Sequence, residues 1–135
     1  MNPIKLTYFQ TLKKIQKVLK IHYNPNPYYK RYIKYRCVEA TKLTHLILPN
    51  LKEQIGDCSN HFHAWNYDPT NNLIIDLSAW QFKNLNITPN TIIFSPKTKT
   101  HKFNKNNLEN YLESLKTPTF QKEIKKLYKT YQNLI

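Results

Sequence analysis

Three residues of this chain, Cys37, His63 and Asp76, have the types and the order of a thiol nucleophile, a base and an orienting acid. A cysteine attacks as the thiolate, so it needs a base that takes its proton, and an imidazole base needs a group that fixes its tautomer. The three lie in the segments Tyr-Arg-Cys-Val-Glu-Ala, His-Phe-His-Ala-Trp and Leu-Ile-Ile-Asp-Leu. The pattern indicates covalent chemistry at Cys37.

A helix is expected to carry Cys37. Apolar and small residues recur at helical spacing in the segment 37–48, and Pro49 ends the pattern. Cys37 then lies in the first turn, where free backbone N–H groups favour a thiolate and can hold a developing oxyanion. A buried structural cysteine on an amphipathic helix is the alternative.

A β-hairpin is expected to carry the other two residues. Its strands are predicted near 61–67 and 73–77, joined by the turn residues 68–71 with Pro69 at the second position of a type I turn. A four-residue turn of this kind pairs His63 with Asp76, with Cβ atoms ~4.5–5.5 Å apart. A five-residue turn would place the two on opposite faces of the hairpin.

Asp76 could instead be a strand-end carboxylate that caps a turn. Burial favours the paired arrangement, because an acid inside an apolar strand is costly to bury without a partner. His61 lies two residues before His63 on the same strand face and is an alternative base. His45 and His101 have no visible partner and are expected at the surface.

The remaining elements follow from helical and alternating patterns. Helices are expected at 4–21, at 106–116 and from Thr117 onward with Pro118 at the first helical position, strands at 91–95 and 99–103, and a loop at 50–60. The order of helices, then antiparallel strands, then helices predicts an α+β fold. A length of 135 residues predicts a single domain, 1–135.

The cysteine that opens a helix, followed by His-Ala-Trp on one strand and Ile-Asp-Leu-Ser on the next, resembles the papain-like and transglutaminase-like thiol enzymes. The pattern is most similar to the compact bacterial papain-fold toxins and deamidases. The resemblance implies N-terminal helices, a small antiparallel sheet and C-terminal helices. It also implies that Cys37 attacks an amide carbonyl, that His63 is the base and that Asp76 orients it.

The resemblance covers about 37–82 of the sequence and adds one further residue. In some deamidating toxins of this group, a glutamine five residues after the aspartate helps to form the oxyanion hole, and Gln81 occupies that position. Tyr35 departs from the family pattern, since many relatives carry glycine two residues before the cysteine. The expected activity is that of a thiol hydrolase on a protein or peptide amide: a glutamine deamidase, a peptidase or a transamidase, with no cofactor.

Metal binding is an alternative chemistry for part of the same sequence. Cys58, His61 and His63 offer one thiol and two imidazoles at a spacing that could hold zinc. The segment lacks a fourth ligand and a Cys-x-x-Cys motif, which weighs against this alternative.

The formal net charge of +13 raises a third alternative, a non-catalytic basic module that binds nucleic acid or an acidic partner. The lysines are spread along the chain without a block of five, and no nucleic-acid motif accompanies them. Abundant Lys, Asn, Ile and Tyr with a single glycine are typical of an AT-rich genome. Nucleic acid is therefore not expected as the main partner.

No apolar run approaches the ~20 residues that a membrane-spanning helix needs. The N-terminal segment lacks the charged start and apolar stretch of a signal peptide. Two cysteines are too few for a disulfide framework. We expect a cytoplasmic protein, or one exported without a recognisable signal peptide.

Overall fold

A computed structural model describes residues 7–23, 37–58, 61–78, 93–94, 101–104 and 108–134. Its elements, in chain order, are α1 (Phe9–Tyr23), α3 (Cys37–Ile47), β1 (Lys52–Cys58), β2 (His61–Asp68), β3 (Leu73–Ile75), β4 (Ile93–Phe94), β5 (His101–Phe103), α4 (Leu108–Leu115) and α5 (Pro118–Asn133). Helices come first, antiparallel strands follow and helices end the described chain. The predicted α+β class is confirmed.

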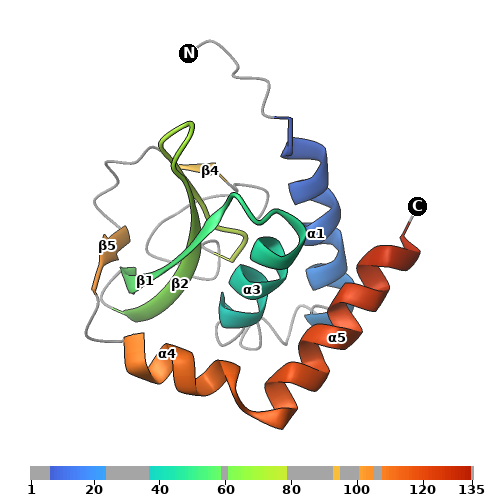
Figure 1. Cartoon of the computed structure of the whole chain (residues 1–135). Coiled ribbons are helices and arrows are strands. Elements are labelled where there is room, and N and C mark those ends of the chain that lie inside the picture. The colour runs from blue at the N-terminus through green and yellow to red at the C-terminus, as the bar shows by residue number, and fades with distance from the viewer. Residues whose placement is uncertain are drawn as a thin grey trace.

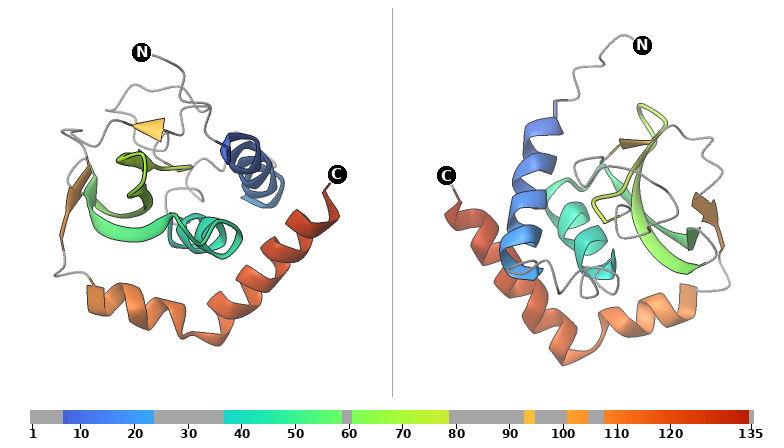
Figure 2. Two further views of the ribbon diagram at one scale, coloured as in Figure 1. Left: turned by 45° about the horizontal axis from the view of Figure 1, so that its top comes forward. Right: turned by 180° about the vertical axis from the view of Figure 1, so that it is seen from behind.

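The described strands form one antiparallel sheet in the order β4-β3-β2-β1-β5. The sheet is strongly curled, and α3 packs against β2 and β1 (Figure 1). Helices α1 and α5 lie beside α3, away from the sheet, and α4 runs from the β5 edge toward α5 (Figure 2). Helix α3 is therefore the central element, with the sheet on one side and two helices on the other.

Two buried clusters hold these layers together. The larger one joins the helices through apolar side chains from α1, α3 and α5, among them Leu12, Ile15, Leu43, Ile124 and Leu127. The smaller one lies between α3, the sheet and α4 and contains Cys37, Ile55, Ala64 and Tyr111. The side chain of Cys37 is thus buried where the start of α3 packs on the sheet.

The segment 50–60, which was predicted to be a loop, contains the inner strand β1, so that prediction was wrong. β1 pairs with β2 along its whole length and with β5 near its end. Three of its seven residues are charged, and these hid the strand pattern in the sequence. The burial of residues along β1 does not alternate strictly.

The hairpin turn lies one residue later than predicted. Asp68 pairs with Leu73 and Tyr67 with Ile74, so the turn comprises residues 69–72. Asp68 holds this turn by accepting hydrogen bonds from the backbone N–H groups of Thr70 and Asn71, at 3.0 and 3.2 Å. The carboxylate of an aspartate commonly fixes a turn in this way, and it extends β2 by one residue.

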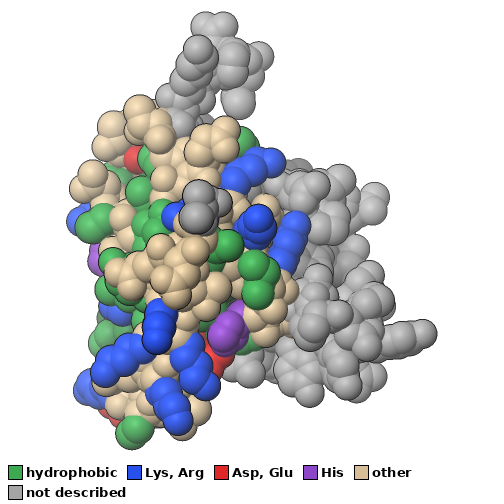
Figure 3. Space-filling model, turned by 90° about the vertical axis from the view of Figure 1, so that its right-hand side faces the viewer, with side chains coloured by type: hydrophobic (Ala, Val, Ile, Leu, Met, Phe, Trp, Pro, Cys, Tyr) green, Lys and Arg blue, Asp and Glu red, His purple; other side chains and the backbone are tan. Residues whose placement is uncertain are grey.

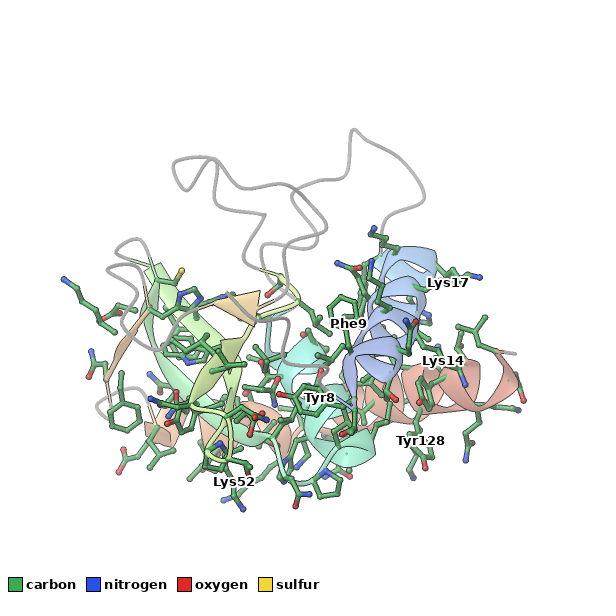
Figure 4. The ribbon with its side chains drawn as sticks, turned by 90° about the horizontal axis from the view of Figure 1, so that it is seen from above. Tyr8, Phe9, Lys14, Lys17, Lys52 and Tyr128 are labelled. Carbon is green, nitrogen blue, oxygen red and sulfur yellow. The ribbon has the colours of Figure 1, made fainter. Side chains whose placement is uncertain are left out.

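The lysines of the described chain concentrate on the outer helices. Helix α1 carries Lys13, Lys14, Lys17 and Lys20, and α5 carries Lys122, Lys125, Lys126 and Lys129. Figure 3 shows basic side chains on the face of the molecule that α1 and α5 form. Figure 4 places Lys14 and Lys17 with Tyr128 on this side, and Lys52 at the sheet side. In the part of the chain that the structure describes, no helix is both long and apolar enough to cross a bilayer.

Candidate functional site

One buried carboxylate lies between two buried imidazoles. Oδ2 of Asp76 is 2.7 Å from Nε2 of His63 and 2.7 Å from Nε2 of His101. Oδ1 of Asp76 accepts hydrogen bonds from the backbone N–H and the hydroxyl of Ser78, at 3.0 and 3.2 Å. The side chain of Asp76 is only 1% exposed, and those of both histidines are 0% exposed. The site is therefore a buried, hydrogen-bonded charge network.

The predicted contact between His63 and Asp76 is confirmed, but by a different register. Continuing the observed pairing of Asn66 with Ile75 would place Asp76 opposite Trp65, two residues beyond His63. Asp76 lies one residue beyond β3, which ends at Ile75 and so is shorter than the predicted strand 73–77. From this position Asp76 is a diagonal neighbour of His63, across a separation of ~7–8 Å between backbones that an imidazole can bridge. The predicted direct pairing was wrong, because Asp68 extends β2 and moves the turn.

Cys37 completes the group that the sequence predicted. It is the first residue of α3, it is buried, and it shares a side-chain hydrogen bond with His63. The amide of Asn66 on β2 donates a hydrogen bond of 3.1 Å to the backbone carbonyl of Thr41, which fixes α3 against this strand. The helix and the sheet therefore bring Cys37, His63 and Asp76 into one chain of contacts.

The charges of this network stabilise one another. Burial raises the pKa of Asp76, but the charge of His63 and the hydrogen bonds from His101 and His63 outweigh it and hold that pKa well below its usual range. Burial lowers the pKa of His63, but the charge of Asp76, the hydrogen bond to it and the contact with Cys37 raise that pKa to about 10. An imidazolium–carboxylate pair is therefore expected at neutral pH.

His101 was expected at the surface, and that prediction was wrong. It is buried, and its ring packs edge-on against Trp65 with ring centroids 5.0 Å apart. The position follows from the pairing of β5 with β1, in which His101 lies opposite Cys58. The sequence indicates a strand near 99–103, but no local signal reveals that this strand pairs with β1.

Cys58 lies on the other side of His101. Its Sγ is 3.8 Å from Nε2 of His101, and burial, with the nearby charges of Asp76 and Cys37, raises its pKa to about 12. A thiol of this kind is a poor nucleophile. Cys37, at the helix start and in contact with His63, is the better candidate for attack.

Of three further candidates from the sequence, only His45 has a side chain that the structure describes. Gln81 and the side chain of His61 lie outside the described residues. His45 is half-buried rather than exposed, and its Nδ1 lies 2.8 Å from the carbonyl oxygen of Leu51, so it closes the turn between α3 and β1.

Comparisons with known proteins give no match to this chain, whether with protein-family models, with curated proteins or with solved structures. The chemistry of the site must be judged from its own residues. These are a buried thiol at a helix start, an imidazole that contacts it, and a carboxylate that holds this imidazole. This set of groups can perform nucleophilic acyl transfer.

Proposed function

We propose that this protein is a thiol hydrolase that cleaves an amide bond of a protein or peptide through an acyl-enzyme at Cys37. The observation that carries the proposal is the position of His63, which contacts Cys37 and holds Asp76 at 2.7 Å in a buried setting. Thiol and serine hydrolases share this arrangement, in which a base contacts the nucleophile and an acid orients the base.

In the first step, Cys37 Sγ attacks the amide carbonyl carbon as a thiolate, and a carbon–sulfur bond forms. The His63 imidazolium then donates its proton to the leaving nitrogen as the carbon–nitrogen bond breaks. This role requires Nδ1 of His63 to face the sulfur, because Nε2 is held by Asp76. The products of this step are ammonia or an amine and a thioester on Cys37.

In the second step, neutral His63 takes a proton from water, and the water oxygen attacks the thioester carbon. The carbon–sulfur bond breaks and releases the acid, with Cys37 restored as thiolate and His63 as imidazolium. A glutamine side chain gives a deamidated product by this route, and a peptide bond gives cleavage. An amine in place of water would give transamidation.

Oxyanion stabilisation falls to the start of α3 and to Gln81. Backbone N–H groups in the first turn of a helix point toward a carbonyl oxygen attacked by a first-turn cysteine. The family resemblance assigns Gln81 to the same oxyanion, as in the deamidating toxins. We extend the proposal to a papain-like or transglutaminase-like fold, supported by the packing of α3 on an antiparallel sheet that carries the histidine.

An electrophilic analogue of a peptide glutamine tests the proposal. The wild type should gain the mass of the analogue, and fragment mapping should place it on Cys37, whereas Cys37→Ala should gain none. Cys58→Ser is the matched control and should still be modified. Modification that persists in Cys37→Ala, or a wild type that stays unmodified while correctly folded, would contradict the proposal.

A further inference from the structure

The thiol-enzyme chemistry leaves two buried groups unused, Cys58 and His101. Both belong to a compact set of soft ligands, since the ligand atoms of Cys58, His63 and His101 all lie within 4.8 Å of one another. The three residues come from three strands, β1, β2 and β5, which the sheet places side by side. The ligands are thus positioned by the fold itself rather than by a flexible loop.

We infer that Cys58, His63 and His101 form a binding site for a zinc-like divalent cation, and that the cation and the reactive form of Cys37 exclude each other. The second half of this inference rests on the proposed function, because His63 belongs to both groups. A cation bound to His63 would take the electron pair that the base needs for catalysis.

The separation of two of the three ligand atoms is close to that in a metal site. Two ligands on one tetrahedral zinc, at ~2.3 Å for sulfur and ~2.0–2.1 Å for nitrogen, lie about 3.6 Å apart. The separation of Cys58 Sγ and His101 Nε2 is 3.8 Å. A small contraction brings the sulfur and this nitrogen onto one ion, and the ion then replaces the hydrogen bond between this nitrogen and Oδ2 of Asp76.

The charge and the chemistry of the donors also suit this cation. One thiolate and two imidazoles are a typical donor set for zinc and leave a fourth coordination position open. The carboxylate of Asp76, which lies 2.7 Å from Nε2 of each histidine in the metal-free protein, supplies a second negative charge close to the thiolate. These two charges together balance a divalent ion in a buried place where an isolated cation would be costly.

The site differs from the one that the sequence alone indicated. The segment around Cys58 suggested His61 and His63 as its partners, whereas the sheet brings His101 from β5 to this position. β5 has only three residues and lies at the end of the described strand order, next to β1. The metal ligands are therefore gathered at one margin of the sheet, beside the thiol centre.

Cobalt(II) is the probe for the site, because a cobalt–thiolate bond gives a charge-transfer absorption band. The wild type should show this band, saturating at one ion per chain. Cys37→Ser should keep it, and Cys58→Ser should lose it. A band that is lost in Cys37→Ser and kept in Cys58→Ser would place the metal on the catalytic pair and overturn the inference, as would a folded wild type without a band.

Zinc inhibition of Cys37 tests the second half. The rate of iodoacetamide modification at Cys37 is measured with zinc and with a chelator, and the ratio is compared between proteins. Zinc should lower the modification rate of Cys37 at least tenfold in the wild type. In folded Cys58→Ser, the rate with zinc should be nearly equal to the rate with the chelator. Equal ratios in both proteins would overturn the exclusion. A cobalt band in the wild type, together with no analogue adduct on Cys37 in the metal-free, chelator-treated wild type, would instead refute the proposed function and leave the metal site standing.

Discussion

Asp76 shares its Oδ2 atom between two histidines, and this makes it the residue with the largest expected effect on the site. Asp76→Asn keeps the volume but removes the charge that both imidazoles face. Loss of one partner from a buried ion pair costs about 3–5 kcal/mol. We expect this decrease in the free energy of unfolding, measured by urea denaturation. The control Ser78→Ala, which removes only the hydroxyl bond to Asp76, should cost about 1 kcal/mol.

The raised pKa of His63 predicts a pH dependence of stability. A histidine whose pKa is higher in the folded state stabilises the fold fully below its unfolded value, and this contribution is lost as the pH rises toward the folded value. The window for His63 therefore runs from about pH 6.5 to about 10. The free energy of unfolding should fall by up to about 1.4 kcal/mol per pH unit in this window.

Above about pH 9, the raised pKa of Cys58 adds to the same decline, so the interval below pH 9 isolates His63. Urea denaturation at several pH values in this interval measures the slope. The slope of the free energy of unfolding against pH should be smaller in Asp76→Asn, because the charge that raises the pKa of His63 is gone. Ser78→Ala should have the slope of the wild type. Equal slopes in wild type and Asp76→Asn would refute the ion pair.

The residues that meet in the site differ in how well the sequence predicts them. His63 and Asp76 lie on adjacent arms of one hairpin, so strand periodicity together with a four-residue turn places them on a common face. Cys37 could be placed at a helix start, and only the packing of α3 on β2 brings it to His63. His101 was missed because its contacts with Asp76 and Cys58 depend on strand pairing between distant segments.

At the scale of elements, the hairpin shows why the predicted contact survives an incorrect register. Moving the turn by one residue at each of its ends changes the partner of His63 by two positions. Side chains alternate between the two faces with a period of two, so a change of two positions leaves every side chain on the same face of the sheet. Both ends of α3 and the start of α5 were predicted within a residue, because Pro49 follows α3 and a capping threonine with a proline precedes α5. β1 carries no such marks.

Gly56 lies in the part of β1 that pairs with β5, and only glycine leaves enough room there for β5. A Cβ at this position would lie 2.0 Å from the carbonyl oxygen of Lys102 and 2.8 Å from the ring of Trp65. Backbone atoms must then move, so Gly56→Ala should displace β5 and lower the free energy of unfolding by about 1–3 kcal/mol. The exposed change Lys52→Ala on the same strand should stay within about 0.5 kcal/mol.

Hydrogen exchange locates the effect of Gly56→Ala. The amide of Asn104 donates to the carbonyl of Ile55 at 3.2 Å and reports on the pairing of β5 with β1. Its protection should fall in Gly56→Ala and stay unchanged in Lys52→Ala. Unchanged protection in Gly56→Ala would show that β5 does not approach β1 as closely as described.

At the scale of the whole molecule, the charge of +13 and the catalytic group are separate features. The lysines of α1 and α5 lie on the outer helices, and one of them, Lys14, packs over the ring of Tyr131 at 4.2 Å. Such a surface attracts any polyanion at low salt without reading its sequence. It need not take part in the chemistry at Cys37.

Duplex DNA should therefore bind weakly, with little sequence preference, and should dissociate as salt approaches ~150 mM. Fluorescence anisotropy measures this binding. The double change Lys125→Gln and Lys129→Gln on the exposed face of α5 should weaken the low-salt binding and leave the labelling of Cys37 unchanged. Submicromolar, sequence-selective binding at ~150 mM salt would favour a nucleic-acid-binding module over the enzyme.

The most direct test of a catalytic thiol at Cys37 is the order in which the two cysteines react. Both are buried, but Cys37 contacts His63 at a helix start, whereas burial raises the pKa of Cys58 to about 12. The folded wild type is treated with limiting iodoacetamide near pH 6, and peptide mass mapping gives the rate at each cysteine. Cys37 should be modified first, and His63→Ala should slow it at least tenfold. Equal rates at both cysteines, or faster modification of Cys58, would contradict the account.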